Sequence, residues 1–435
     1  MPFFGFKGGI HPQYNKSATS GCAVERLAVK AGDIVSIPLS QHIGAPAKAV
    51  VTKGQQVKKG ELIAEAAGFI SSPVHSSVTG KVLGIASVIH PMAGRVEGIS
   101  IEAECDDEDF VPAPDTETFQ KAVQAAGITG LGGASFPSHV KLSPPKEVDT
   151  LLINGAECEP YLTCDHRMMI ERSLDIVKGA VLIQKNLKIK NLIIAIEKNK
   201  PASIALFRKM EKEYGFELIP LDVKYPQGGE KQLIKACTDR IVPEGKLPLE
   251  VGVIVHNVGT AAAVYDAVEH KKPLFERVVT VTGAVRNPKN LLVPIGTPIS
   301  RLIEECGGFI GVPRKIVMGG PMMGLAVSSM ETPVIKGTSG ILVYRQEDLP
   351  DLKQTPCIRC GRCVDACPMA LVPSAMDRYV VREMYEALEE YHVMNCIECG
   401  CCTYVCPARR TLASGFRTSK RHILRMIKER EANNA

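Results

Sequence analysis

The chain has 435 residues, of which 45% are hydrophobic and 23% charged, and its formal net charge is +5 at pH 7. This length exceeds what one hydrophobic core usually holds, so we expect several domains. The composition excludes a disordered or fibrous protein, and the charge is too small to indicate nucleic-acid binding. No secretory signal is recognisable, and no apolar run approaches the roughly 18 residues of a membrane-spanning helix. We therefore expect a cytosolic protein, in which disulfides do not readily explain the 15 cysteines.

Short strand-like runs separated by glycines fill residues 31–88 and predict a small barrel or sandwich. The stretch VKKGELIAEA, followed by SSPVHSSVTGKV, resembles the biotinyl/lipoyl barrel-sandwich family, which attaches its cofactor to a lysine at an exposed hairpin tip. Here the expected tip reads SSPVHSS and contains no lysine. We therefore interpret this domain as structural, with a swinging-arm carrier as the alternative.

An acidic, proline-containing linker, ECDDEDFVPAPDTET, precedes a change to strands that alternate with helical segments. Buried strands are predicted at 150–154, 191–197, 216–223 and 251–257. Each is followed by a polar or glycine-rich motif: NGAECEP, EKNKP, KYPQGGEK and HNVGT respectively. Because ligands of doubly wound sheets bind beyond the carboxyl ends of the strands, these four motifs predict one shared site.

A glycine-rich segment, GLGGASFPSHVKL, lies just before the first of these strands, at 130–142. Its glycines allow the backbone to approach a phosphate, Phe136 could stack on a ring, and Lys141 could meet a phosphate. Alone, such a segment is more often just an ordinary loop. Its position ahead of the strand-end motifs makes a nucleotide site the better interpretation.

Residues 277–344 return to short strands, with one helix near PISRLIEECGG and a glycine-rich MGGPMMG, which favours a small α+β domain. The C-terminal segment GFRTSKRHILRMIKEREANNA predicts a basic helix. Its short apolar stripe favours docking or a solvated terminal helix over contact with a membrane surface.

Two cysteine runs with identical spacing, CIRCGRCVDACP and CIECGCCTYVCP, begin at Cys357 and Cys396. Both match C-x2-C-x2-C-x3-C-P, in which the fourth cysteine ligates the other of two [4Fe–4S] clusters. The ligands predicted for the first cluster are Cys357, Cys360, Cys363 and Cys406. Those predicted for the second are Cys396, Cys399, Cys402 and Cys367. Two zinc sites are the alternative, but zinc favours pairs of ligands separated by a dozen residues or more.

The remaining cysteine of this region, Cys401, is out of register and is interpreted as a packed or cluster-shielding thiol. The linker SAMDRYVVREMYEALEEY has apolar residues near helical spacing and predicts a helical insert. If the electron donor is NADH, a flavin is needed to convert between two-electron and one-electron chemistry.

The order and wording of these motifs resemble the flavin- and NADH-binding subunit of respiratory complex I. Nearly the whole chain, including GGIHP, QGGEKQL, GGPMMG and both cysteine runs, resembles the C subunit of the Rnf family of ion-pumping ferredoxin:NAD oxidoreductases. The resemblance implies non-covalent FMN, NAD(H) as substrate, and a set of cofactor-binding residues. These are Gly130, Gly132, Gly133, Phe136, Lys141, Asn154, Glu157, Glu159, Gly229, Glu230, Asn257 and Thr260.

Within this implied set, Glu159 matches an acid near the nicotinamide nucleotide. The complex I motifs have an Asp, a Gly and a second acidic residue where this sequence has Ala156, Cys158 and Lys231 respectively. The nucleotide contacts therefore need not be the same. The three glutamates of the set could instead act as helix-capping acids.

The predicted fold is multidomain α/β and α+β. It comprises an N-terminal segment and barrel-sandwich domain (1–112), a Rossmann-like FMN/NADH domain (113–276), a β-grasp (SLBB-type) domain (277–346), a ferredoxin-like helical domain with two [4Fe–4S] clusters (347–412) and a basic helix (413–435).

The predicted function is that of the electron-input or output subunit of a membrane-bound, ion-translocating ferredoxin:NAD oxidoreductase, with no catalytic residue beyond the cofactors. Its expected partners are an iron–sulfur subunit and integral membrane subunits. Its expected place is the cytoplasmic face of the bacterial membrane, peripheral and without a spanning segment. The alternative class is a plain electron-transfer or scaffold protein that has lost nucleotide binding.

Overall fold

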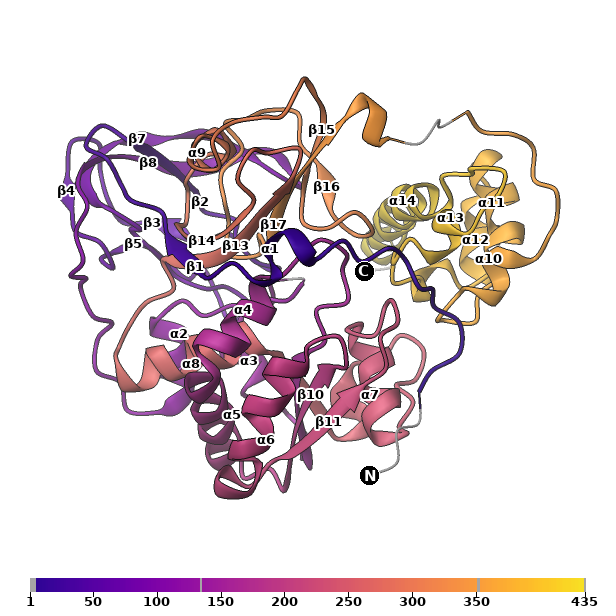
Figure 1. The fold of residues 1–435 in the computed structure, drawn as a ribbon, viewed down its shortest axis with the longest axis horizontal. Coiled ribbons are helices and arrows are strands. Elements are labelled where there is room, and N and C mark those ends of the chain that lie inside the picture. The colour runs from indigo at the N-terminus through magenta and orange to yellow at the C-terminus, as the bar shows by residue number, and fades with distance from the viewer. Residues whose placement is uncertain (1–4, 134, 350–352, 434–435) are drawn as a thin grey trace.

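A computed structural model describes residues 5–133, 135–349 and 353–433. The described residues form four β-sheets, followed by a C-terminal group of helices that lies to one side of them (Figure 1). The order of these parts along the chain confirms the predicted fold class.

Two antiparallel sheets form the N-terminal β domain, with strand orders β2-β8-β7-β4 and β3-β5-β6. Their strands are β2 (Ile34–Pro38), β3 (Lys48–Ala49), β4 (Gln56–Val57), β5 (Leu62–Glu65), β6 (Val74–His75), β7 (Thr79–His90) and β8 (Gly94–Cys105). The SSPVHSS segment, residues 71–77, is buried along its whole length. It is therefore not the exposed tip that the lipoyl comparison leads one to expect, and no swinging arm can start there.

A parallel sheet of order β11-β10-β9-β12 forms the α/β domain. Its elements are α2 (Phe119–Ala125), α3 (Ser138–Lys141), β9 (Thr150–Gly155), α4 (Cys164–Glu171), α5 (Ser173–Leu187), β10 (Asn191–Glu197), α6 (Pro201–Tyr214), β11 (Glu217–Leu221), α7 (Glu230–Thr238), the 3-10 helix η1 (Pro248–Val251), β12 (Val253–Asn257) and α8 (Val258–Glu269). The last two strands are shorter than predicted. For β12 the reason is that the chain forms η1 and turns at Gly252, with φ 69°, before the strand begins.

The strand order of this sheet reverses between β9 and β12, which are paired directly. Asn154 and Asn257 are register partners at the carboxyl ends of these two strands. In open α/β sheets the ligand crevice lies at such a switch point, so the topology itself places a site beside these two asparagines.

A six-stranded mixed sheet of order β1-β14-β13-β17-β15-β16 forms the next domain. Its elements are β1 (Val24–Arg26), β13 (Glu276–Gly283), β14 (Lys289–Pro294), α9 (Ile299–Glu305), β15 (Pro313–Met318), β16 (Leu325–Ala326), β17 (Gly340–Arg345) and the 3-10 helix η2 (Gln346–Asp348). The first strand comes from the N-terminal segment, after the short helix α1 (Ser17–Ser20), and pairs in parallel with β14. Chain order alone had assigned this segment to the first domain.

Lys336 lies where the three sheet-containing domains meet. Its ammonium donates hydrogen bonds to the carbonyls of Pro73 (2.9 Å) and Gly127 (2.7 Å), which belong to the β domain and the α/β domain. The side chain is fully buried, and burial lowers its pKa from 10.5 to about 7. A hydrogen-bonded amine thus joins these three domains.

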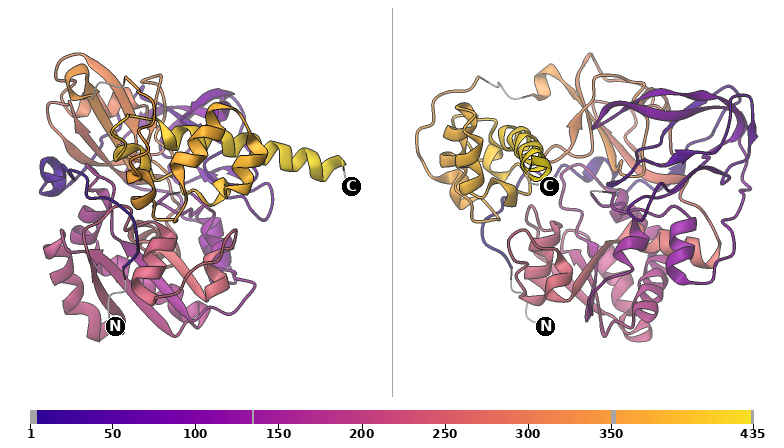
Figure 2. Two further views of the ribbon diagram at one scale, coloured as in Figure 1. Left: turned by 90° about the vertical axis from the view of Figure 1, so that its right-hand side faces the viewer. Right: turned by 180° about the vertical axis from the view of Figure 1, so that it is seen from behind.

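The C-terminal domain is helical and consists of α10 (Arg362–Asp365), α11 (Pro373–Val381), α12 (Tyr385–Glu390), the 3-10 helix η3 (Val393–Asn395), α13 (Cys401–Tyr404) and α14 (Leu412–Asn433). The helical insert between the cysteine runs is two helices, because the chain turns at Glu383, whose φ is 54°. The end of α14 extends beyond the rest of the domain (Figure 2, left).

Candidate functional site

The glycine-rich segment lies beside the switch point of the parallel sheet. Leu131 N–H donates to the hydroxyl of Thr260 (2.9 Å), which fixes the segment against the start of α8. Gly132 and Gly133 are exposed, and a Cβ at Gly132 would lie 2.8 Å from the side chain of Asn257. Only glycine fits at this point, so the backbone of the segment remains accessible to a ligand.

The two asparagines at the strand ends are each fixed by neighbouring groups. Asn154 donates to the carbonyl of Gly228 (2.9 Å), which connects the end of β9 to the loop before α7. Asn257 caps α8 by accepting from Gly259 N–H (2.8 Å), and its amide donates to Asp165 (2.6 Å). Three loops from separate parts of the sequence therefore meet at the carboxyl edge of the sheet, where the ligand crevice of an open α/β sheet is expected.

Glu157 follows β9 in the left-handed conformation, with φ 46°. Its side chain is 3% exposed; it accepts from Asp165 N–H (2.7 Å) and lies 3.6 Å from the Lys16 ammonium. Burial together with the charge of Glu157 raises the pKa of Asp165 to about 6. Strained backbone of this kind is common at ligand sites.

Glu159 reaches away from the crevice toward the β-grasp domain. Its carboxylate accepts hydrogen bonds from the backbone N–H groups of Met323 (2.6 Å) and Met322 (3.3 Å), within the MGGPMMG segment. Burial raises its pKa to about 7, although these two hydrogen bonds act in the opposite direction. In this structure Glu159 connects two domains.

Lys141 and Glu230 form an ion pair (2.8 Å), and both side chains are partly exposed. Glu230 begins α7, and Gly229 is the residue before it. Phe136 is half-buried, and its carbonyl accepts from Gly130 N–H (2.9 Å). The structure thus brings the predicted glycine, lysine and acid positions to the carboxyl edge of the sheet.

These residues fit a flavin nucleotide. The exposed glycine backbone and Lys141 suit a phosphate, and the amide of Asn154 suits a ribityl chain. Nearby, the buried amide of Gln227 has neither its oxygen nor its nitrogen hydrogen-bonded within the described part of the chain. Buried polar groups normally have partners, so a bound ligand is a reasonable source of the missing ones.

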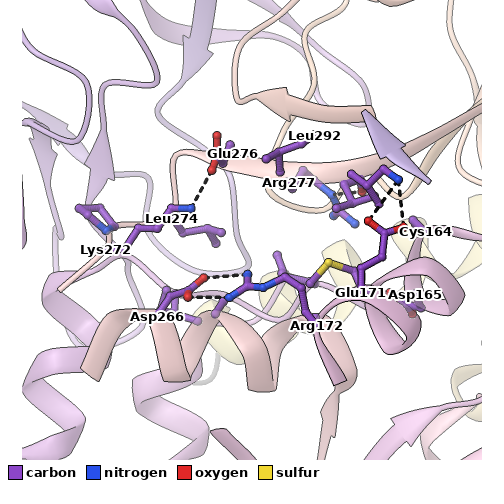
Figure 3. A pocket seen from close by; sticks show the side chains of 18 residues that line it. Cys164, Asp165, Glu171, Arg172, Asp266, Lys272, Leu274, Glu276, Arg277 and Leu292 are labelled. Carbon is purple, nitrogen blue, oxygen red and sulfur yellow. Dashed lines mark hydrogen bonds and ion pairs between the residues drawn. The ribbon is translucent and has the colours of Figure 1, made fainter. Parts of the chain in front are cut away.

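A cavity of ≈300 Å³ lies behind the glycine-rich segment, between α4, α8 and strands β13 and β14 (Figure 3). Its charged groups are largely paired: Arg172 binds Asp266 through two hydrogen bonds (2.9 and 2.7 Å), and Lys272 binds Glu276 (2.7 Å). The predicted flavin residues do not line it. We interpret it as a seam between domains and not as the nucleotide crevice.

The cysteines predicted to hold the first cluster line one cavity in the C-terminal domain, together with Ser374 and Asp377. They are Cys357, Cys360, Cys363 and Cys406. Three come from the first run and one from the second, in agreement with the exchange of the fourth cysteine. We call this group the first cysteine site. Four thiols facing one cavity fit a [4Fe–4S] cube.

The other four predicted ligands are also brought together. The pKa of Cys402 is raised first by burial and then by the nearby thiols of Cys396, Cys399 and Cys367. We call this group the second cysteine site. Cys401 is fully buried beside it, and its thiol lies 3.9 Å from the carbonyl of Tyr225.

The second cysteine site packs directly on the α/β domain. The buried hydroxyl of Tyr225 donates to the carbonyl of Cys399 (2.8 Å), and Gln232 on α7 donates to the carbonyl of Pro368 (3.3 Å). Tyr225 lies in the KYPQGGEK motif, so it is part of the loop that contacts Asn154. One loop therefore touches both the nucleotide crevice and the second cysteine site.

The N-terminal GGIHP segment passes between these two parts, as the indigo chain in Figure 1 shows. Ile10 pairs with Tyr225 as a β-bridge, and Gly9 N–H donates to the carbonyl of Ala366 (2.9 Å). A Cβ at Gly8 would lie 2.5 Å from the carbonyl oxygen of Cys367. The N-terminal segment is therefore closely packed against both the α/β domain and the helical domain.

Sequence reasoning did not assign roles to Tyr225, Gly8, Lys16 or Asp165. The available signal was that Tyr225 and Gly8 lie within motifs already recognised as unusual, KYPQGGEK and GGIHP. Lys16 and Asp165 gave no such signal, because their contacts depend on how distant segments fold together.

Comparison with protein-family models gives four matches in chain order. They are the RnfC barrel sandwich hybrid domain at residues 4–107, the Nuo51 FMN-binding domain at 123–266, the SLBB domain at 278–326 and the 4Fe-4S dicluster domain at 350–407. These matches confirm the predicted cofactors, FMN and two [4Fe–4S] clusters. Together with the crevice and the paired cysteine sites, they define an iron–sulfur flavoprotein that transfers electrons.

Three relatives, each a C subunit of its complex, extend this assignment over most of the chain. That of the proton-translocating ferredoxin:NAD(+) oxidoreductase complex of Clostridium ljungdahlii is 45% identical, over 90% of this chain and 88% of its own. That of the Na(+)-translocating complex of Acetobacterium woodii is 44% identical, over 96% and 97%. That of the ion-translocating oxidoreductase complex of Rhodobacter capsulatus is 42% identical, over 85% and 74%. The chain belongs to this family, the C subunits of ion-translocating ferredoxin:NAD+ oxidoreductase complexes.

Throughout residues 5–133, 135–349 and 353–433, no helix combines the length and apolar character needed to cross a membrane.

Proposed function

We propose that this chain exchanges electrons with NAD(H) at the crevice of the α/β domain and passes them, through two [4Fe–4S] clusters, to or from partner subunits of a membrane-bound complex. The observation that carries the proposal is the contact of one loop, around Tyr225, with both the crevice and the second cysteine site. Bound FMN would supply the conversion between the two-electron chemistry of nicotinamide and single-electron transfer.

In this proposal the protein's own residues bind and orient the flavin and the nicotinamide nucleotide. Gly130, Gly132, Gly133 and Lys141 would hold the flavin phosphate, since they offer backbone amides and a cation at the edge of the sheet. Asn154, Glu157, Asn257 and Thr260 would fix the remainder of the nucleotide. Phe136, Gly229 and Glu230 are partly exposed, and they would contact nicotinamide or flavin.

The position of Glu159 limits its role in this proposal. Because its carboxylate is occupied by two N–H donors of the β-grasp domain, it would act by holding that domain beside the crevice. A direct contact with the nicotinamide nucleotide, as the complex I resemblance implies, would require these hydrogen bonds to break.

The arrangement also gives the clusters an order. The second cysteine site is buried against the α/β domain, whereas Cys357 and Cys360 of the first are exposed. The second cluster would therefore exchange electrons with the flavin, and the first with the partner. An iron–sulfur subunit is the expected partner, and integral membrane subunits would hold the complex at the cytoplasmic face.

Cofactor analysis of anaerobically purified protein tests the proposal. We expect one FMN and roughly eight iron atoms per chain, as two [4Fe–4S] cubes require. Addition of NADH should bleach the flavin absorbance and reduce the clusters, as seen by electron paramagnetic resonance. A protein with eight irons but no flavin, and inert to NADH, would instead be a plain electron-transfer or scaffold chain.

A further inference from the structure

The first cysteine site opens to solvent through an apolar patch. Ile358 is 66% exposed and lines the same cavity as Cys357 and Cys360, and exposed Pro407 lies at the same cavity. An exposed isoleucine between two cluster ligands contributes little to the core. Apolar groups at the centre of a polar surface are the usual composition of a protein–protein contact.

Four arginines lie on or beside the elements that form this cavity. Arg359 lines the cavity, Arg362 begins the adjacent helix α10, and Arg378 and Arg382 lie on or directly after α11, next to Asp377, another cavity residue. All four side chains are exposed, and we call them the arginine rim.

The rim has few carboxylates to pair with. Residues 357–382 contain two, Asp365 and Asp377, and Asp377 is already bound by Arg410 (2.8 Å). Of the four glutamates at 383–390, Glu386 and Glu389 are bound by Arg430. Within the described parts of the chain, no ion pair involves the four guanidinium groups of the rim. One of them, that of Arg382, donates a single hydrogen bond to the carbonyl of Arg378 (3.2 Å). Guanidinium groups without a carboxylate partner can bind carboxylates of another molecule through two parallel hydrogen bonds.

The second cysteine site shows the opposite arrangement. Its neighbouring cations, Arg417 and Lys420, both bind Glu398 (2.8 Å each), and Lys420 also donates to the carbonyl of Cys396 (2.8 Å). The cations at the second site therefore stabilise the fold through contacts within the chain. At the first site Arg410 is likewise paired, with Asp377, but the four arginines of the rim are presented to solvent (the helical domain faces the viewer in Figure 2, left).

We propose that the arginine rim, together with Ile358, is the docking surface for an acidic iron–sulfur protein. This docking proposal rests on the proposed function, and it adds the chemical character of the partner. Cys357, Cys360, Cys363 and Cys406 would hold the cluster that exchanges one electron with the partner's iron–sulfur centre, so that one centre would be oxidised and the other reduced with no bond or proton exchanged. Complementary charge raises the rate of encounter by about 10- to 1000-fold at low salt and suits a small, transient contact.

The test uses an acidic bacterial two-[4Fe–4S] ferredoxin as the probe. The ferredoxin is reduced in advance and mixed anaerobically with the oxidised holoprotein, and the second-order rate of cluster reduction is measured at low and high ionic strength. Two variants reverse the rim charge: Arg359→Glu/Arg362→Glu and Arg378→Glu/Arg382→Glu. The matched control is Lys209→Glu/Lys212→Glu, which reverses two exposed charges on α6.

Both rim variants should lower the rate at low salt by about tenfold or more and lose most of the salt dependence, because steering is electrostatic. The control should remain within about twofold of the parent. The α11 variant leaves the cysteine-run segments unchanged, so it keeps the test valid if the other variant loses iron. Equal rates in rim variants, control and parent would overturn the proposal.

Two further readouts separate other roles of the rim. If the arginines only balance the negative charge of the cluster, the variants will shift the cluster potential in a redox titration, and the rate loss will be the same at low and high salt. If the rim binds lipid, the variants will lose co-sedimentation with phosphatidylglycerol vesicles and keep the ferredoxin rate. Either result overturns the proposal. Bleaching of the flavin by NADH is measured separately, so failure of the proposed function is distinguishable.

Discussion

The two cysteine sites share one sequence spacing but differ in their surroundings. The first has two exposed cysteines and a rim of four exposed arginines. The second has no exposed cysteine among its four predicted ligands, a hydrogen bond from Tyr225, and cations held by Glu398. Spacing determines which thiols can share a cluster. The surroundings determine what that cluster can exchange electrons with, and this information lies outside the cysteine runs.

The largest expected difference comes from removing one ligand at each site. Cys402→Ala should reduce the free energy of unfolding by on the order of 5 kcal/mol, because metal-binding energy is also folding energy and this cluster connects the helical domain to the rest. Cys357→Ala removes an exposed ligand and should have clearly less effect. Anaerobic denaturation, together with iron counting, measures the loss of stability in both variants. Equal losses would contradict the proposed difference between the two sites.

A methyl group at Gly8 should disturb the second site alone. Gly8→Ala places a Cβ 2.5 Å from the carbonyl of Cys367 at a φ of +71°, which should cost about 1 kcal/mol for the backbone and about 1–3 kcal/mol for the overlap. Gly54→Ala has a similar φ, +89°, but no atom within 4 Å, and should show the backbone cost only. Faster loss of the second cluster's resonance signal in Gly8→Ala, and not in Gly54→Ala, is the expected result.

The hydrogen bond from Tyr225 can be removed without changing the ring. Tyr225→Phe leaves the carbonyl of Cys399 without this donor in a buried place and should cost about 1–3 kcal/mol in chemical denaturation. The matched change at exposed Tyr404 should stay within about 0.5 kcal/mol. Similar values for both would show that this contact does not stabilise the second site.

Lys336 lies outside both cysteine sites, so a change there should affect stability without affecting either cluster. The folded pKa of Lys336 is about 7, against 10.5 ordinarily, so the unfolded chain binds one more proton between these values. Stability should therefore rise with pH across this window, by up to about 1.4 kcal/mol per unit, and fall as pH is lowered toward 7.

Lys336→Met should remove this rise and leave both cluster spectra unchanged, whereas Lys315→Met, at an exposed position on β15, should keep it. A Lys336→Met variant that retains the full slope would assign the titration to another group.

Local patterns made much of the fold predictable. The strands at 150–154 and 191–197 are continuous apolar runs ending in polar motifs, and they form β9 and β10 at nearly these limits. The fold class, the family and the cofactors are confirmed, while the domain boundaries and the individual ligand roles stay predictions. Cysteine spacing predicted which thiols would meet, because that depends on a few residues of local chain.

Contacts between distant segments were not predictable. Glu159 accepts from Met322 and Met323, which lie in another domain, and the SSPVHSS segment is buried because neighbouring domains cover it. Neither has a periodic signal in the sequence. Both arise from packing between domains that are distant in the sequence, and no short sequence pattern indicates such packing.

The passage of the N-terminal segment beside Cys367 has a consequence for biosynthesis. Gly8 and Gly9 leave the ribosome long before their partners, Ala366 and Cys367, which are made more than 350 residues later. Domains otherwise tend to fold in order from the N-terminus. The surroundings of the second cluster are therefore completed only after the three sheet-containing domains have been made, which makes its insertion a late step in maturation.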